Sequence, residues 1–372
     1  MADNIKLIKP YIAFADIKNE LEDVFESGMF TKGVNVDKFQ EQLKSYTEAA
    51  HCFLTTSATT ALSICLQCIG IKSGDKVAIS DYSWPATAHV VEEIGAIPVF
   101  IDVDIDTFNM KLSSLLEIID SDIKAVIFVD ALGNPSGIED IAKICKEKKI
   151  PLIEDSACGL GSSVAGKKIG NIADLTCFSF HPRKLITTGE GGAVMTNNSD
   201  YARWMKVKLA VGVSGMKDNI LDFTTYGYNY RLSEIQALMG WKQVEKLDSI
   251  TEERNLIADV YENKLSEYGF SRQKRDGNVY HNVQSLVFKV PKHLIRDELI
   301  SHLALHNIES TLGTYCLSST TYYSVKYNSV QKASSELEKC AITLPCYKNV
   351  DVDKITNLII EFSQARKLTS VT

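Results

Sequence analysis

A lysine follows a short apolar run in the middle of the chain and precedes a glycine-rich segment. The apolar run at residues 175–180 ends in a proline-containing turn, and Lys184 comes directly after it. Three glycines at positions 189, 191 and 192 precede a second apolar run at residues 193–195. This pattern predicts two strands flanking a glycine-rich hairpin, with Lys184 at the turn. Such a lysine is either solvated or held at a strand end, where burial keeps its amine neutral and nucleophilic.

Two carboxylates follow another short apolar run. Pro151-Leu152-Ile153 leads straight into Glu154 and Asp155, and ligands of open α/β sheets bind at the carboxyl ends of the strands. A buried aspartate there is costly unless it faces a positive charge, and a protonated pyridine nitrogen is such a charge. A lysine that forms an imine and an aspartate that pairs with a pyridinium together indicate pyridoxal phosphate (PLP) as the cofactor.

These two motifs resemble those of a known family, the DegT-type PLP-dependent sugar aminotransferases of the aspartate aminotransferase superfamily (fold type I). Residues 179–184 and 189–192 are similar to the family's lysine motif, and residues 154–157 are similar to its aspartate motif. The resemblance covers most of the chain. It implies that Lys184 holds PLP as a Schiff base and moves a proton during catalysis, while Asp155 keeps the ring nitrogen protonated.

Lys167 and Lys168 are rival candidates for the imine lysine. They follow Gly166 in a polar segment for which we predict a turn with no strand behind it. We therefore favour Lys184.

A small, hydroxyl-rich turn opens the first strand–helix unit. The strand-like run at residues 51–56 leads into Ser57, Ala58 and Thr59, and an apolar helix then extends to about Gly70. Free N–H groups at a helix N-terminus, together with hydroxyl groups, form an anion site. Simple N-capping by Ser57 explains the same residues. In the family this turn binds the PLP phosphate, usually with glycine where Ala58 stands, and alanine keeps the N–H donors.

The resemblance implies roles for five further residues. Ser179 joins the phosphate-binding turn, and Trp84 stacks on the pyridine ring, although a packing role explains Trp84 equally well. Asn229 reaches the phosphate of a neighbouring subunit, which implies a homodimer with shared active sites. Tyr315 and His181 are candidate substrate contacts.

The remaining pattern predicts an α/β fold. Strand and helix patterns alternate through the first half of the chain, which favours a mainly parallel sheet with helices on both faces. We predict a PLP-binding large domain at residues 1–250 and a smaller C-terminal α+β domain at residues 251–372, with one long helix from Ser233 to about Leu265 as the connector. No GxGxxG motif follows a strand, which disfavours a nicotinamide site.

Bulk properties exclude several classes of protein. A net charge of −7 argues against a general nucleic-acid binder, and no apolar run is long enough for a membrane span. Nine cysteines are scattered along the chain, and the Cys65/Cys68 pair has no second pair nearby, so we expect no metal site. The chain start has no apolar signal core, and we expect a cytoplasmic enzyme with reduced thiols.

The predicted reaction is amino transfer from L-glutamate to a keto sugar, with a nucleotide-linked 4-keto-6-deoxy sugar as the favoured acceptor, in surface-polysaccharide or amino-sugar biosynthesis. Four positions depart from the family pattern: Asp130, Cys158, Val211 and Ser318. The family usually has histidine or glutamine at the position of Cys158 and histidine at the other three. A smaller phosphorylated ketone or a keto-cyclitol is therefore an alternative acceptor. A PLP-dependent sugar dehydratase is a further alternative, but relatives with that chemistry replace the lysine with histidine. A non-enzymatic binding protein would be expected to lose Lys184 or Asp155.

Overall fold

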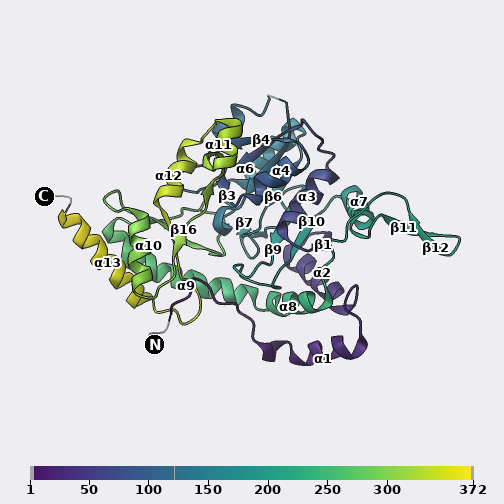
Figure 1. Cartoon of the computed structure of the whole chain (residues 1–372), viewed down its shortest axis with the longest axis horizontal. Helices are drawn as coiled ribbons and strands as arrows, with labels where there is room; N and C mark the ends of the chain where they lie inside the picture. The colour runs from purple at the N-terminus through teal and green to yellow at the C-terminus, as the bar shows by residue number, and fades with distance from the viewer. Residues whose placement is uncertain (1–3, 121, 370–372) are drawn as a thin grey trace.

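The structure is a computed structural model that describes residues 4–120 and 122–369. A seven-stranded sheet forms the centre of its larger part, in the order β1-β10-β9-β6-β5-β2-β4 (Figure 1). The strands β9, β6, β5, β2 and β4 run parallel to one another, which confirms the mainly parallel sheet. β10 runs antiparallel to both of its neighbours, β1 and β9, which confirms the hairpin whose two strands flank Lys184. The strands are β1 (His51–Thr55), β2 (Lys76–Ser80), β4 (Ile97–Ile101), β5 (Ile123–Val129), β6 (Leu152–Asp155), β9 (Leu175–Ser179) and β10 (Gly192–Thr196).

Helices cover both faces of this sheet, as the alternating pattern predicts. Val126 and Phe128 of β5 pack into one buried cluster with α2, α6 and α8, whereas Ala125 and Ile127 pack into another with α3, α4 and α7. Because successive side chains of a strand point to opposite faces, both faces of a parallel sheet need such a cover. The helices are α2 (Val34–Thr47), α3 (Ala58–Cys68), α4 (Ala86–Glu93), α5 (Leu112–Leu116), α6 (Ile138–Lys148), α7 (Ser199–Leu209) and α8 (Glu234–Val244).

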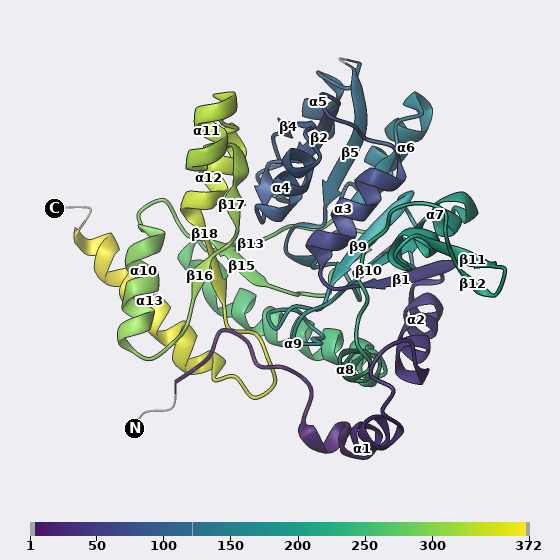
Figure 2. The same cartoon turned by 45° about the vertical axis from the view of Figure 1, so that its right-hand side comes forward.

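The C-terminal part forms a second layer with its own core. Its four-stranded antiparallel sheet has the order β13-β15-β18-β16 and packs against α10 and α13 (Figure 2). The N-terminal segment joins this layer, because Ile5 pairs with Ile308 and packs on its core. The elements are β13 (Ser271–Arg272), β15 (Leu286–Lys289), β16 (Thr311–Leu312), β18 (Ala341–Leu344), α10 (Arg296–Leu305) and α13 (Val352–Thr369). The boundary at residue 250 stays a prediction.

Shorter elements connect or flank these layers. They are α1 (Lys18–Ser27), α11 (Thr321–Tyr327), α12 (Lys332–Cys340), β3 (Tyr82–Ser83), β7 (Ser163–Val164), β8 (Lys167–Lys168), β11 (Val213–Lys217), β12 (Ile220–Phe223), β14 (Val279–Tyr280) and β17 (Tyr315–Cys316). Among the described residues, no helix combines the length and the apolar character that crossing a membrane requires.

The structure corrects the single long helix that the sequence predicts from Ser233 to Leu265. α8 ends at Val244 and α9 (Leu247–Leu265) begins three residues later. Glu245 and Lys246 form a two-residue turn between the two helices, and Lys246 has φ −101° and ψ −1°. The two ends of α9 pack on different cores, with Leu247 in the core of the large sheet and Leu265 in the C-terminal core. Glu245 and Lys246 are ordinary helix formers and give no local signal for the break.

A buried carboxylate from α8 caps the N-terminus of α2. The two oxygens of Glu234 accept hydrogen bonds from the backbone N–H groups of Gly33, Asn35 and Val36 at 2.8, 2.8 and 3.1 Å. Glu234 is 1% exposed, so this one side chain satisfies donors that the first turn of α2 leaves free.

Replacing Glu234 with alanine is expected to lower the free energy of unfolding by about 2–4 kcal/mol, because three donors lose a charged acceptor. Glu234→Gln keeps one carbonyl oxygen and should lose less. Urea unfolding followed by circular dichroism measures both. Equal stability of wild type and the alanine variant would show that the cap contributes nothing.

Candidate active site

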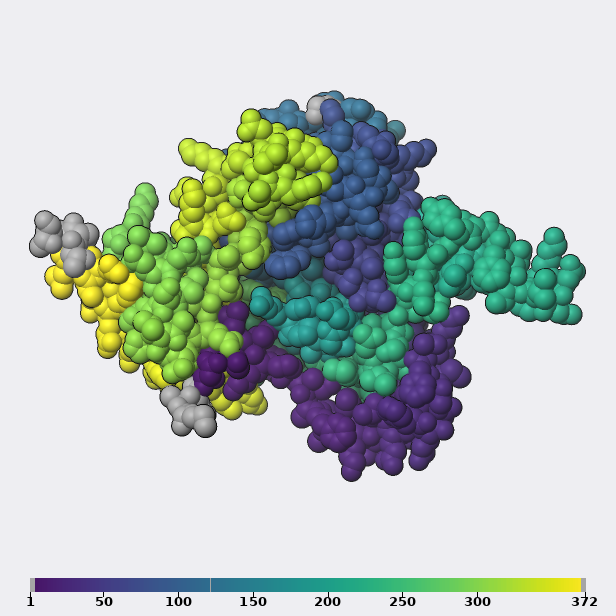
Figure 3. Space-filling view, viewed as in Figure 1, coloured from purple at the N-terminus to yellow at the C-terminus, as the bar shows by residue number. Residues whose placement is uncertain are grey.

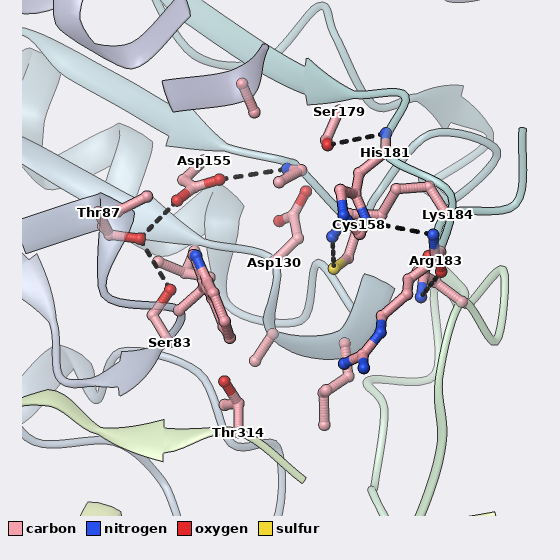
Figure 4. Close-up of a pocket in the computed structure, with 18 of the residues that line it drawn as sticks. Ser83, Thr87, Asp130, Asp155, Cys158, Ser179, His181, Arg183, Lys184 and Thr314 are labelled. Carbon is pink, nitrogen blue, oxygen red and sulfur yellow. Dashed lines mark hydrogen bonds between the residues drawn. The ribbon is translucent and has the colours of Figure 1, made fainter. Parts of the chain in front are cut away.

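A cavity of about 540 Å³ opens at the carboxyl ends of β5 and β6, beside the turn that carries Lys184 (Figure 4). Eight of the ten residues assigned from the sequence line it: Ser57, Ala58, Thr59, Trp84, Asp155, Ser179, His181 and Lys184. The other two, Tyr315 and Asn229, lie outside its lining. Residues more than 120 positions apart in the sequence therefore meet at one sheet edge.

The hairpin between β9 and β10 positions Lys184. The backbone N–H of Lys184 donates to the carbonyl of His181 at 2.8 Å, which closes the turn. Gly189 has φ +81°, a conformation that glycine adopts without strain. A Cβ on Gly192 would lie 2.5 Å from the backbone of Ser57, so glycine there allows β10 to pack directly on the start of α3.

The amine of Lys184 contacts a thiol. Its Nζ donates to Cys158 Sγ at 3.0 Å, and both side chains are half-buried. The backbone around Cys158 is held from the C-terminal part of the chain, because the side-chain amide of Asn282 donates to the carbonyls of Cys158 and Leu160, each at 2.8 Å.

Asp155 lies at the base of the cavity with both oxygens engaged. Thr87 Oγ1 donates to one oxygen at 2.6 Å, and the N–H of Ala157 donates to the other at 3.2 Å. Burial raises the pKa of Asp155, while these two hydrogen bonds and the charge of Lys184 oppose that rise. A cationic group placed opposite this carboxylate would also oppose the rise in its pKa.

The turn at Ser57 has the N-cap geometry expected of this residue. Ser57 Oγ accepts from the N–H of Thr60 at 3.1 Å, and the Thr60 hydroxyl bonds back to the N–H of Ser57 at 3.1 Å. Ala58 and Thr59, whose N–H groups have no partner within their own helix, line the cavity. N-capping and anion binding are therefore compatible at this turn.

Three of the residues assigned from the sequence, Trp84, Tyr315 and Asn229, lie at the edge of the cavity or outside it. Trp84 is 62% exposed and lies edge-to-face with Tyr315, with 5.7 Å between ring centroids. Tyr315 belongs to β17, which pairs with β3 just before Trp84. Asn229 is exposed in the segment that follows β12.

The two rival lysines lie elsewhere. They form β8, which pairs with β7, so the turn predicted for them is wrong. Neither lysine lines the cavity, and Lys168 forms an ion pair with Asp248 at 2.8 Å. The short strand escaped prediction because two polar residues carry no period-2 apolar pattern.

Two of the four positions that depart from the family pattern line the cavity, namely Asp130 and Cys158. The other two do not, and Ser318 instead donates from its N–H and hydroxyl to the buried carboxylate of Asp81 at 2.7 and 2.8 Å. The departures at Asp130 and Cys158 therefore change residues that line the cavity, whereas Ser318 binds a buried carboxylate within the protein.

Sequence reasoning missed several residues of the lining. Thr87 holds Asp155, Arg183 lies exposed beside the lysine turn, and Gln284 donates from Nε2 to the Arg183 carbonyl at 3.2 Å. Thr87 sits one turn beyond Trp84 in a helical segment, and the only available signal was a hydroxyl residue close to a candidate site residue. Gln284 comes from the C-terminal part and carried no local signal.

Two further acids near Asp155 are buried, namely Asp130, which lines the cavity, and Glu154, which does not. Asp130 accepts from Ser156 Oγ at 2.5 Å and Glu154 accepts from Thr176 Oγ1 at 2.8 Å, while the second oxygen of each has no partner among the described residues. Burial, and next the charge of Glu154, raises the pKa of Asp130. Burial raises the pKa of Glu154 to about 7, opposed by the hydrogen bond from Thr176.

Wild-type stability is expected to fall as the pH rises through about 7, because Glu154 has a higher pKa in the folded than in the unfolded chain. Its contribution is fully present below about 4.5 and is lost above about 7. Glu154→Gln keeps an acceptor for Thr176 but cannot ionise. Between about pH 5.5 and 8.5, wild type should lose about 1–2 kcal/mol more unfolding free energy than this variant. Urea unfolding at both pH values measures the difference, and parallel losses would contradict the assignment.

Three features of the cavity fit pyridoxal phosphate. An amine lies in the cavity at Lys184, a buried carboxylate with a raised pKa lines it at Asp155, and a helix N-terminus with hydroxyl groups lies at Ser57. These are the partners that an aldehyde, a protonated ring nitrogen and a phosphate require.

Comparison with known proteins gives matches along nearly the whole chain. GDP-perosamine synthase of Escherichia coli O157:H7 is 30% identical over 329 residues, 87% of this chain and 88% of that protein. The UDP-4-amino-4,6-dideoxy-N-acetyl-beta-L-altrosamine transaminase of Campylobacter jejuni subsp. jejuni serotype O:23/36 is 36% identical over 250 residues, 66% of each chain.

A solved structure and a family model agree with these relatives. Helicobacter pylori PseC, an aminotransferase involved in the biosynthesis of pseudoaminic acid, has a TM-score of 0.92 at 25% identity, covering 98% of this chain and 100% of that chain. The model of the DegT/DnrJ/EryC1/StrS aminotransferase family matches residues 13–362. The chain therefore belongs to the DegT/DnrJ/EryC1/StrS aminotransferase family and is a pyridoxal phosphate-dependent aminotransferase.

Proposed function

We propose that this aminotransferase moves the amino group of L-glutamate to a nucleotide-linked 4-keto-6-deoxy sugar. The observation that carries the proposal is the convergence of Lys184, Asp155 and the N-terminus of α3 on one cavity of about 540 Å³. The names of two relatives, GDP-perosamine synthase and a UDP-linked amino-sugar transaminase, support a sugar nucleotide as the acceptor.

Each residue of the cavity has a role in this proposal. Pyridoxal phosphate, when bound, supplies a ring that withdraws electrons from the carbon that loses or gains a proton. Asp155 is held in place by Thr87 and keeps the ring nitrogen protonated. Ser57, Thr59 and Ser179 bind the phosphate. Lys184 Nζ takes a proton from the donor α-carbon and returns one to the carbon that becomes the amine carbon of the product.

An absorbance experiment tests the donor and the acceptor separately. L-Glutamate added to the purified PLP-loaded enzyme should convert the visible band to one at shorter wavelength, and a keto acceptor should then restore the visible band. GDP-, UDP- and TDP-linked 4-keto-6-deoxy sugars are compared with smaller phosphorylated ketones and keto-cyclitols. Restoration only by the smaller ketones would overturn the sugar-nucleotide proposal, and a deoxygenated product without nitrogen would identify a dehydratase.

We further propose a homodimer in which Asn229 of one subunit completes the active site of the other. The hairpin of β11 and β12 projects from the body of the molecule just before Asn229 (Figure 3). Met216, Ile220, Leu221 and Phe223 on this hairpin are each more than half exposed. Apolar side chains gathered on a projecting hairpin favour a buried position against a second copy, which would also carry Asn229 toward that copy.

Subunit mixing is expected to reveal the shared site. Lys184→Ala and Asn229→Ala should each be poorly active alone, but a hybrid dimer has one site with both residues intact. Random reassociation of equal amounts should then recover about a quarter of wild-type activity. Unmixed variants and mixtures without a dissociation step serve as controls. No recovery in mixtures that contain hybrid dimers would show that Asn229 acts within its own subunit or not at all.

A further inference from the structure

One guanidinium in the cavity lining has no hydrogen-bond or ion-pair partner among the described residues, and it belongs to Arg183. All eight arginines of the chain lie within those residues. Six of them bind a carboxylate, a side-chain amide or backbone carbonyls through the guanidinium: Arg203, Arg254, Arg272, Arg275, Arg296 and Arg366. Arg183 and Arg231 have no such contact in the described part of the chain, and of these two only Arg183 lines the cavity.

The backbone of Arg183 is fixed, whereas its side chain is exposed. The N–H of Arg183 donates to His181 Nδ1 at 3.2 Å, and its carbonyl accepts from Gln284 Nε2 at 3.2 Å. Gln284 is buried and belongs to the C-terminal part of the chain, so both parts hold this turn. In Figure 4 the guanidinium extends from the lysine turn into the cavity, away from Asp155. The cation is therefore anchored at its backbone and available to a ligand.

Arg183 supplies the positive charge that remains in the described lining once the cofactor is bound. Three acids line the cavity, namely Asp130, Asp155 and Glu190. Lys184 is the other basic side chain of the lining, and in the proposed function the cofactor takes up its amine. Burial lowers the pKa of His181, Glu190 opposes that shift, and the charges of Lys184 and Arg183 add to it, so this imidazole is neutral near pH 7.

We propose that Arg183 is a substrate-binding residue that holds an oxyanion on the unreactive part of the substrate. The inference rests on the proposed function, in which both substrates are anions and occupy the same cavity in successive half-reactions. L-Glutamate offers a carboxylate and the sugar nucleotide offers a diphosphate. A guanidinium matches both, because its planar fork donates two parallel N–H bonds to a carboxylate or a phosphate.

The position of Arg183 in the lysine turn suits this role. Arg183 and Lys184 are neighbours in one turn, so an anion bound to the guanidinium ties the substrate down close to the amine that moves the proton. Such an anchor restricts the orientation of the reacting carbon. Ser285 and Thr314 line the same cavity and add hydroxyl groups that can donate to the oxyanion. In a chain of net charge −7, a local cation also favours the entry of an anion.

The first experiment follows the donor. L-Glutamate is titrated into PLP-loaded wild type and Arg183→Gln, and the decrease of the visible band gives the half-saturating concentration. Arg183→Gln should keep the band but require about tenfold more L-glutamate, because one charge-assisted contact is lost. Arg203→Gln is the matched control, since Arg203 pairs with Asp200 and lies outside the cavity lining. It removes the same charge from the chain and should titrate like wild type.

The second experiment follows the acceptor without turnover. UDP and GDP are titrated by calorimetry into the same three proteins loaded with pyridoxamine phosphate. Arg183→Gln should bind the nucleotide that wild type prefers about tenfold more weakly. The difference should shrink at high salt, because an exposed cation is screened. Arg183→Lys keeps the charge without the fork and should recover part of the affinity.

The two experiments distinguish the source of the oxyanion. Weaker L-glutamate binding alone identifies a donor carboxylate, weaker nucleotide binding alone identifies the diphosphate, and both losses show that Arg183 serves each substrate in turn. Equal titrations of wild type and Arg183→Gln in both experiments would overturn the inference. A wild type that responds to neither L-glutamate nor the nucleotides would instead overturn the proposed function, and this inference with it.

Discussion

Lys184→Ala is expected to abolish transamination, with a loss of at least about 10³-fold in the rate of the half-reaction with L-glutamate. In the proposed function, the variant loses both the amine that binds the cofactor and the group that moves the proton, so these two functions fail together. It should retain the fold, because Lys184 is only half-buried and Cys158 is its one side-chain hydrogen-bond partner in the described structure. The visible absorbance band of wild type should be missing from the variant.

A neighbouring cation gives a matched control for this result. Arg183→Ala removes a positive charge from the same turn but leaves the amine of Lys184 in place. It should keep the visible band, because the amine that forms the imine is untouched; the response to L-glutamate is not part of this control, because Arg183 lines the cavity. A Lys184→Ala protein that still showed the band and its shift would place the imine on another lysine, with Lys168 the first to examine.

Asp155→Asn is expected to lower the rate of the same half-reaction by about 10²–10³-fold. Asparagine has nearly the shape of aspartate and can still accept from Thr87, but it cannot supply the charge that keeps the ring nitrogen protonated. The loss should therefore be in the rate of the chemical step, measured by rapid mixing at saturating L-glutamate. Thermal unfolding should change little, because the carboxylate is costly to bury.

Thr87→Val separates the charge of Asp155 from its position. The substitution removes the 2.6 Å hydrogen bond and leaves the carboxylate in place. A loss of about tenfold is expected, as one hydrogen bond to a charged group is removed. If the valine variant lost as much as the asparagine variant, orientation rather than charge would be the main contribution of Asp155.

The sequence was sufficient where the signal is local. Apolar runs ending in Asp155 and before Lys184 predicted strands whose carboxyl ends meet, and the structure has β6 and β9 side by side and parallel. Ser57 predicted an N-cap, and its side chain makes that hydrogen bond. Whether a segment forms a strand or a helix depends largely on the spacing of apolar residues within that segment, so the local sequence is enough to indicate it.

The sequence was insufficient where the determinant lies far along the chain. The break between α8 and α9 has no glycine or proline to mark it. The two ends of α9 pack on different cores, which makes this helix the connector between the two parts of the chain. Glu234 caps α2 from about 200 residues away, a contact that no local motif at Gly33 indicates. Such contacts depend on packing geometry, which a one-dimensional pattern does not contain.

The sequence by itself determined the strands and helices of the central sheet, the identity of the candidate lysine and aspartate, and the cofactor that those two residue types serve. Only the tertiary structure decided that Thr87 holds Asp155, that Cys158 touches Lys184 and that Glu154 and Asp130 are buried. The reason is physical. A short segment determines its own backbone, whereas the hydrogen-bond partners and pKa values of a side chain depend on which distant segments pack around it.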